Sequence, residues 1–326
     1  FQLAQFSEMI KQCKLSSIPL LFIEEPESHM HPQMQQTFIN FLESFLEKIS
    51  NIHIQTIITS HSSHIANAID FTKIRYAQKK EEKVTYKDLN RFVDANPGNA
   101  DFVKKYLTLS KCDLFFADKA IFIEGASERL LIPDMIKKCD QKGYFTTKHK
   151  LTSQYYTLIE VGGAYAYKFI PFANFLGIPS LIITDIDTVK KENAKYKACL
   201  VSEGETTSNK TIKEWMKDYI TLESGEKLSV SEIKELNNEK KTKGICHIEY
   251  QIEENGLCGR SLEEAIRNVN RGIYGLNTSV SEEDIRFNDK CKTDFALDLI
   301  LKYEDYDIPK YIIDGLVWLN NQTANV

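Results

Sequence analysis

The stretch Ala120-Ile-Phe-Ile-Glu-Gly-Ala-Ser-Glu128 has the same pattern as a second stretch further along the chain, Leu181-Ile-Ile-Thr-Asp-Ile-Asp187. Each stretch begins with a short apolar run that predicts a buried strand. Each run leads into two acids, which together are Glu124, Glu128, Asp185 and Asp187. Four carboxylates at the ends of two buried strands are unfavourable unless a cation lies among them. Because oxygen ligands select hard cations, the two motifs predict a site for Mg²⁺ or Mn²⁺.

The expected local structure explains the spacing of these acids. Gly125 permits a tight turn after the first strand. Glu128 then falls in the first turn of a helix, where the helix dipole favours a carboxylate. Asp185 and Asp187 are two residues apart, so on an extended backbone their side chains point the same way. Solvated acids at strand ends are the alternative, but the paired motifs favour a metal site suited to phosphoryl transfer.

This order of motifs resembles the TOPRIM fold, whose signature is a strand-end Glu followed by Asp-x-Asp. The version here is similar to the nuclease domain of the OLD (overcoming lysogenization defect) family. Leu158-Ile-Glu-Val-Gly-Gly-Ala-Tyr165 fits the expected second strand and its glycine turn. Arg260-Ser-Leu-Glu-Glu264 resembles the later Ser-x-Glu metal site of that family, and Lys292-x-x-Phe295-Ala296 resembles its catalytic lysine segment. The resemblance implies an α/β fold with a Rossmann-like parallel sheet.

The same resemblance implies two metal ions and a role for each motif. The ligands of an ion that activates water would be Glu124, Asp185 and Asp187. The groups near a second ion, which supports the departing 3′ oxygen, would be Glu128, Ser261 and Glu263. Lys292 would stabilise the pentavalent phosphate. From the residues alone, Ser261 also fits a helix N-cap, and Lys292 also fits an ordinary surface lysine.

A second group of motifs lies upstream. Ile18-Pro-Leu-Leu-Phe-Ile-Glu-Glu-Pro-Glu27 resembles the Walker B strand of ABC-type ATPases, and Ser28-His-Met-His-Pro-Gln33 resembles their D-loop. The strand Ile54–Ser60 leads into a histidine that matches the switch histidine. By this resemblance Glu24 would support Mg²⁺ through water, Glu25 would polarise the attacking water, and His61 would sense the γ-phosphate. Family members often carry Asp where Glu24 stands.

The phosphate-binding loop of such ATPases is absent from the sequence. No Gly-x-x-x-x-Gly-Lys-Ser/Thr motif occurs, so no loop here is suited to cradle the phosphates of ATP. The chain also opens at Phe1 without a methionine. We therefore expect it to be the C-terminal part of a longer protein, with ATP bound and hydrolysed only by the full-length form.

Composition limits the class of protein. A length of 326 residues suits two domains, and a hydrophobic content of 42% is ordinary for a globular chain. No apolar run is long enough to span a membrane. Seven cysteines without a Cys-x-x-Cys pair argue against a disulfide framework and favour the bacterial cytoplasm. The net charge of −5 does not argue against DNA binding, because several of the acids belong to the proposed metal sites.

The expected organisation is the C-terminal part of an ABC-type ATPase domain followed by a TOPRIM nuclease domain. The predicted segments are 1–76 for the ATPase part, 77–117 for a helical connector, 118–300 for the TOPRIM domain and 301–326 for a C-terminal segment. An insertion over 188–245 is expected to contain helices at 211–219 and 229–240. Its basic run Glu239-Lys-Lys-Thr-Lys243 suits a solvated face, or alternatively a clamp on the DNA backbone. Residues 320–326 are expected to fray.

These features predict a metal-dependent DNA endonuclease of the OLD type, serving antiviral defence. The D-loop resemblance implies a homo-oligomer, a dimer or a dimer of dimers, assembled through the ATPase side. The resemblance extends to the Gabija nuclease subunit, which implies a helicase partner, and to retron effectors, which implies a reverse transcriptase with msDNA. Two alternatives remain open: another TOPRIM enzyme such as a topoisomerase or primase, and a non-catalytic SMC-like ATPase or DNA-binding module.

Overall fold

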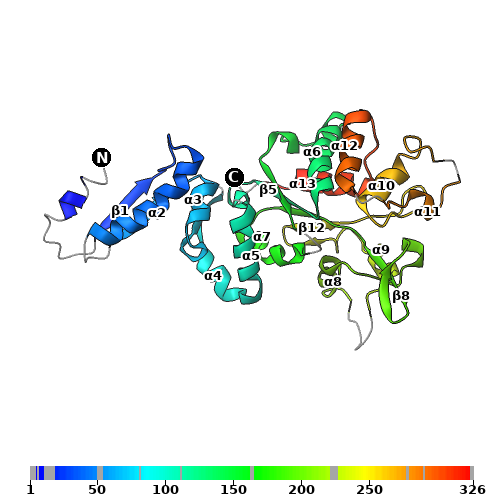
Figure 1. Cartoon of the computed structure of the whole chain (residues 1–326), viewed down its shortest axis with the longest axis horizontal. Coiled ribbons are helices and arrows are strands. Elements are labelled where there is room, and N and C mark those ends of the chain that lie inside the picture. The colour runs from blue at the N-terminus through cyan, green and yellow to red at the C-terminus, as the bar shows by residue number, and fades with distance from the viewer. Residues whose placement is uncertain are drawn as a thin grey trace. The chain divides into compact units, whose positions relative to one another are not determined.

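The computed structural model describes residues 5, 7–10, 19–49, 54–80, 82–110, 112–161, 165–220, 227–276, 279–288 and 291–323. The chain divides into two compact units (Figure 1). The first comprises residues 1–78 and 82–116, and the second comprises residues 79–81 and 117–326. Each unit is described by itself below.

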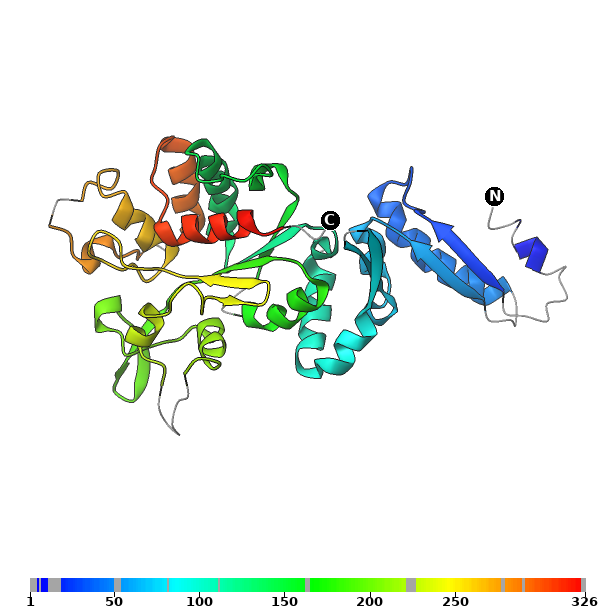
Figure 2. The ribbon, with the colours of Figure 1, turned by 180° about the vertical axis from the view of Figure 1, so that it is seen from behind.

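The first unit contains the pair of strands expected from the upstream motifs. β1 (Leu20–Glu24) and β2 (Gln55–Thr59) pair in parallel, with Glu24 opposite Thr59. Helix α2 (Pro32–Ile49) runs beside the strands and contacts α3 (Ser63–Ala68) (Figure 2). Burial alternates along both strands, so one face of the pair is exposed and carries Leu20, Phe22 and Ile57.

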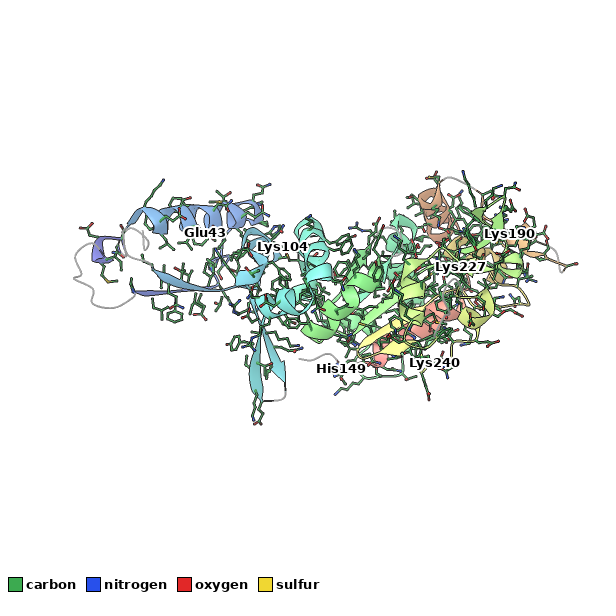
Figure 3. The ribbon with its side chains drawn as sticks, turned by 90° about the horizontal axis from the view of Figure 1, so that it is seen from below. Glu43, Lys104, His149, Lys190, Lys227 and Lys240 are labelled. Atoms are coloured by element: carbon green, nitrogen blue, oxygen red, sulfur yellow. The ribbon has the colours of Figure 1, made fainter. Side chains whose placement is uncertain are left out.

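The segment expected to be a helical connector also contains two strands. β3 (Arg75–Lys80) and β4 (Lys83–Asp88) pair as a narrow hairpin that projects from its unit (Figure 3). Helices α4 (Leu89–Ala95) and α5 (Pro97–Ser110) follow, and they are separated at Asn96. The hairpin escaped prediction because its strands are rich in Lys, which is depleted in strands.

The second unit is built on the parallel sheet that the TOPRIM resemblance predicts. Its described strands run in the order β11-β12-β7-β5-β6. Their bounds are β5 (Lys119–Ile123), β6 (Tyr156–Glu160), β7 (Ser180–Ile183), β12 (Cys246–Glu249) and β11 (Thr242–Lys243). The pairs β12–β7, β7–β5 and β5–β6 are parallel, and β11 joins the edge antiparallel. The glycine turn expected after β6 lies outside the described residues.

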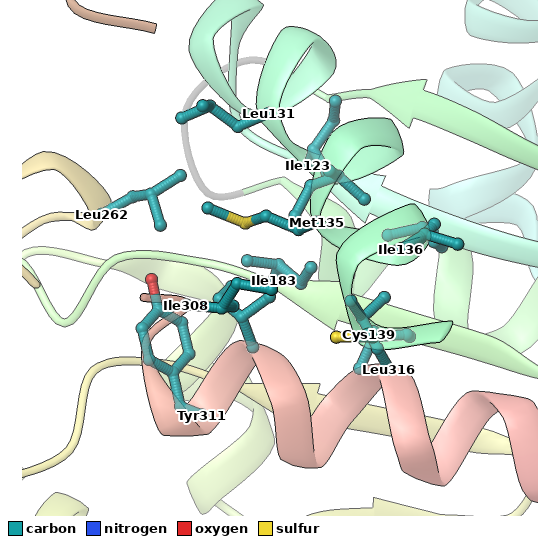
Figure 4. Close-up of a cluster of buried hydrophobic side chains, with 14 of the residues drawn as sticks. Ile123, Leu131, Met135, Ile136, Cys139, Ile183, Leu262, Ile308, Tyr311 and Leu316 are labelled. Carbon is teal, nitrogen blue, oxygen red and sulfur yellow. The ribbon is translucent and has the colours of Figure 1, made fainter. Parts of the chain in front are cut away.

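Helices cover both faces of this sheet. Three of them, α6 (Ala126–Gln141), α12 (Lys292–Lys302) and α13 (Lys310–Asn321), contribute to the main hydrophobic core (Figure 4). Ile123 and Ile183 of the sheet point into this core beside Met135 and Leu316. On the other face Phe122 packs against Phe169, just before α7 (Ile170–Leu176). This core fixes the carboxyl ends of β5 and β7 next to each other.

The expected insertion contains strands as well as helices. β8 (Thr188–Glu192), β9 (Lys195–Ala198) and β10 (Thr206–Thr207) form an antiparallel sheet in the order β10-β8-β9. The two helices are shorter than predicted: α8 is Lys210–Met216 and α9 is Val230–Lys234.

The basic run at the end of the insertion is not a solvated face throughout. Lys241 is 5% exposed, and its Nζ lies 2.7 Å from Oε2 of the buried Glu249. Lys243 pairs with Asp218. Lys241 is therefore neither a surface lysine nor a DNA clamp, because the buried carboxylate already takes up its charge.

The C-terminal segment belongs to the second unit. Lys119 Nζ, at the start of β5, donates to the carbonyl oxygens of Leu319 and Asn320 at 2.7 and 3.0 Å. The side chain of Asn320 is buried and accepts from the Leu151 amide at 2.8 Å. The expectation that Asn320 frays is therefore wrong. Among the described helices, none combines the length and the hydropathy that a membrane crossing needs.

Candidate functional site

Acidic side chains gather at the carboxyl edge of the parallel sheet. Glu124 directly follows β5, and Asp185 follows β7 after one intervening threonine. Glu128 lies in the first turn of α6, as predicted, and Glu263 lies in the first turn of α10 (Leu262–Val269). Lys292 is the first residue of α12. Gly125 is the N-cap of α6 with an extended φ of −159°, so the turn there does not require a glycine.

Glu124 is held through one of its two oxygens. Oε1 accepts hydrogen bonds from the Thr184 hydroxyl, from the Asp185 amide at 3.1 Å and from Asn209 Nδ2 at 3.0 Å. Within the described residues Oε2 has no hydrogen-bond partner, which leaves it available to a ligand. Burial raises the pKa of Glu124, and Asp187 adds to this rise, against the three hydrogen bonds.

Asp185 is held in the same manner. Its Oδ1 accepts from Gln251 Nε2 at 2.6 Å and from the Leu262 amide at 3.0 Å. The residue is 6% exposed. Burial, and then the charges of Glu124 and Glu128, raise its pKa well above the usual value.

Glu263 lies at the centre of a second set of contacts. It is fully buried, and its two oxygens accept from Ser127 Oγ at 2.9 Å and from Ser261 Oγ at 2.8 Å. Ser261 is also the N-cap of α10, so the helix-cap interpretation is confirmed. Glu128 is close enough that the charge of Glu263 adds to burial in raising its pKa. The hydroxyl of Ser127 reaches Glu128 as well, at 3.3 Å.

Lys292 supplies positive charge to these acids. Its Nζ lies 3.0 Å from Glu263 Oε2 and 3.9 Å from Asp185 Oδ2, although half of the side chain is exposed. Burial alone would lower the pKa of Lys292, but the two carboxylates raise it above its usual value. The ammonium group is therefore charged at neutral pH and lies against Glu263 and Asp185.

The backbone at Asp187 is not extended, contrary to the expectation that the side chains of Asp185 and Asp187 point the same way. β7 ends at Ile183, and Asp187 has a left-handed φ of 48°, so the two aspartates do not lie on one extended run. Arg260 Nη2 lies 2.8 Å from Asp187 Oδ1, and Arg260 Nε donates to the Thr188 carbonyl at 3.2 Å. Burial raises the pKa of Asp187, and the arginine opposes that rise. Asp187 still lies close enough to raise the pKa of Glu124.

The donor set suits a hard divalent cation. The acids Glu124, Glu128 and Asp185 each have a raised pKa, because burial and repulsion between neighbouring acids penalise their ionised forms in spite of Lys292. A bound cation would remove this penalty. Among the described residues, no three His, Cys, Asp or Glu side chains form a group that could hold a metal ion as they stand. The carboxylates would therefore have to draw together around an ion.

The three residues expected to serve the ATPase lie at the ends of β1 and β2. Glu24 ends β1 and is exposed, and Glu25 has a left-handed φ of 40°. His61 Nε2 lies 3.4 Å from Glu25 Oε1, and both side chains are largely exposed. The amide of His61 donates to Glu27 Oε1 at 2.6 Å. The strand pairing thus brings His61 next to Glu25.

Among the residues that contact the acids without having been predicted are Asn209, Gln251 and Arg260. Each contacts an acid of the site, but each lies on a segment far from that acid in the chain. A weak signal existed for Asn209, because Asn before a helical run is a typical N-cap. Arg260 belongs to the motif that resembles the Ser-x-Glu metal site, but the resemblance assigns no role to the arginine itself. Nothing in the sequence indicates that Gln251 contacts an acid.

Comparison with known families agrees with both sets of motifs. Residues 115–187 match the TOPRIM domain of overcoming lysogenization defect-like proteins, and residues 2–66 match an AAA ATPase domain. The chain is homologous to Endonuclease GajA of Bacillus cereus strain HuB5-5, with 30% identity over 93% of this chain and 49% of that protein. It is also homologous to the Old nuclease of Escherichia phage P2, with 25% identity over 94% of this chain and 51% of that protein.

A further relative is Endonuclease GajA of Bacillus cereus strain VD045, with 25% identity over 58% of this chain and 30% of that protein. The chain spans about half the length of the first two relatives. It therefore contains an OLD-like TOPRIM domain and a segment of an AAA ATPase domain, and its α/β fold is the expected one.

Proposed function

We propose that this protein is a metal-dependent DNA endonuclease of the OLD type that acts in antiviral defence. The observation that carries the proposal is the cluster of buried and half-buried acids with raised pKa at the carboxyl edge of a TOPRIM sheet, next to the ammonium of Lys292. Relatives that are named endonuclease and nuclease support the same activity.

The residues divide into two groups around the proposed reaction. Glu124, Asp185 and Asp187 would hold one divalent ion, with Asp187 first released from Arg260. The groups near a second ion would be Glu128, Ser261 and Glu263. Mg²⁺ or Mn²⁺ would supply Lewis-acid stabilisation of the phosphoryl group. Lys292 would place its charge against the non-bridging oxygens of the scissile phosphate, where charge builds up during the displacement.

Cleavage of supercoiled plasmid by the full-length protein tests this proposal. We expect Glu124→Ala and Asp185→Ala to abolish cleavage in Mg²⁺ or Mn²⁺, because a lost metal ligand usually removes most of the rate. Asp298→Ala is the matched control, since Asp298 is exposed and pairs with Lys302. Unchanged cleavage by both site variants would refute the nuclease assignment.

The ATPase segment would control the nuclease and not act alone. We propose that the 326-residue chain hydrolyses no measurable ATP, whereas the full-length protein does so and loses this activity on Glu25→Gln. The contact between His61 and Glu25 supports this assignment of the switch histidine. Robust ATP hydrolysis by the chain alone would contradict it.

We further propose that the protein acts in the cytoplasm as a homo-oligomer joined through the ATPase side. A dimer would place two nuclease sites in one assembly, which suits cleavage of both strands. A helicase subunit, or a reverse transcriptase with msDNA, would be the partner, depending on the defence system. Sedimentation and plasmid cleavage by the full-length protein across ATP concentrations test this. A strict monomer whose cleavage ignores nucleotide would refute it.

A further inference from the structure

Asn209 connects the insertion to the acidic site. It is 1% exposed and lies at the start of α8, outside the parallel sheet. Its Nδ2 lies 3.0 Å from Glu124 Oε1, 2.6 Å from Thr184 Oγ1 and 2.9 Å from the carbonyl oxygen of Asp185. One amide group therefore reaches both the residue after β5 and the two residues after β7.

The orientation of this amide is set by the helix. Asn209 Oδ1 accepts from the amide of Ile212 at 3.1 Å, as the N-cap of α8. Because the helix takes the oxygen, the nitrogen must face the acids. The backbone amide of Asn209 donates to Thr207 Oγ1 at 2.9 Å, and that hydroxyl donates to the carbonyl of Ile186 at 2.6 Å. The insertion thus holds Asn209 through two hydrogen bonds, one to its side chain and one to its backbone.

The amide also determines which oxygen of Glu124 is free. The Thr184 hydroxyl accepts from Asn209 and can therefore direct its own hydrogen to Glu124 Oε1. With the Asp185 amide, three donors converge on this single oxygen. The second oxygen, Oε2, has no partner among the described residues. A carboxylate fixed in this way is prepared to bind an ion through one oxygen.

We propose that Asn209 is a positioning residue that fixes Glu124 as a ligand bound through Oε2 alone. This inference rests on the proposed metal site, and it makes the insertion part of that site. Without Asn209, Glu124 would lose one of its donors and would reach other rotamers. Partners of metal ligands that act in this way typically contribute about 10–100-fold to metal affinity.

Mn²⁺ binding by the 326-residue chain, followed by electron paramagnetic resonance, tests the inference. Asn209→Ser keeps a good helix cap but is too short to reach Glu124, and we expect it to weaken Mn²⁺ binding at least about 10-fold. The control is Ser229→Ala, which removes the N-cap of α9 elsewhere in the insertion. It should change Mn²⁺ binding less than about twofold, although it lowers the melting temperature.

The outcomes separate this inference from the function on which it rests. Binding by Asn209→Ser within about twofold of wild type would overturn the positioning role and leave the metal site intact. Equal weakening by Ser229→Ala would also overturn it, since the effect would then follow from a loosened insertion. Absence of Mn²⁺ binding by the wild-type chain would overturn both the metal site and this inference.

Discussion

Replacing Asp185 by Asn should stabilise the protein without divalent cations and remove most of its stabilisation by them. Asp185 is 6% exposed, and burial together with Glu124 and Glu128 raises its pKa well above the usual value. Its Oδ1 accepts from Gln251 and from the Leu262 amide, and the Oδ1 of an asparagine can keep both bonds. The substitution therefore removes a negative charge and changes the shape very little.

The expected gain depends on pH with a definite sign. Because the folded state raises the pKa of Asp185, this group supports stability fully below its unfolded pKa of about 3.9. That contribution is lost as the pH rises through the folded pKa. The variant and the wild type should therefore be similar near about pH 4 and diverge at higher pH. Relief of one buried charge should contribute about 1–2 kcal/mol, or about 2–8 °C in Tm.

Divalent cations should make the wild type more stable than Asp185→Asn. The wild type gains about 2.7 kcal/mol when Mn²⁺ is present at about 100 times its Kd, whereas the variant should gain little. Thermal unfolding in EDTA and in Mn²⁺, over a range of pH, measures both effects. Asp298→Asn, at an exposed site, is the control. The reasoning is refuted if Asp185→Asn is less stable than wild type at high pH in EDTA and is stabilised by Mn²⁺ to the same extent.

Three further substitutions test other parts of the structure. Lys292→Met removes an ammonium group that pairs with the acids, so cleavage should fall while Mn²⁺ binds more tightly; weaker Mn²⁺ binding would contradict this. Lys241→Met leaves the buried Glu249 without its cation and should cost about 3–5 kcal/mol in urea unfolding. Adding Glu249→Leu should recover most of that loss, and no recovery would disprove the pairing. Gly315→Ala should lower Tm because its Cβ would lie 2.9 Å from a buried leucine of β7. The control, Gly98→Ala in α5, meets no atom within 4 Å and should not lower Tm.

The parts of the site that could be predicted are those that depend on local sequence. Apolar runs before Glu124 and Asp185 define strands, and the parallel sheet then brings the strand ends together. Glu128 and Ser261 were predicted at helix starts because capping and dipole effects act over a single turn.

The parts that could not be predicted depend on tertiary contacts. Lys241 lies in a run of charged residues that is typical of a surface, yet it is buried because the edge strand brings Glu249 to it. Asp187 leaves the extended conformation and pairs with Arg260, a residue from a distant loop. Composition and spacing carry no signal for such pairings, since they arise only once the sheet and the insertion pack.

The negative charge at the carboxyl edge of the sheet favours metal binding but lowers the stability of the fold. Acids with raised pKa repel one another when they ionise, so the ends of β5 and β7 would tend to separate in the absence of a cation. Neutral donors oppose this separation, because Asn209 bridges Glu124 and the Asp185 carbonyl without adding charge. Gln251 acts similarly, since it donates to Asp185 and accepts from the Ile186 amide. Amides can hold the acids close in this way and still leave their negative charge for the ion, which lysines in the same positions would have neutralised.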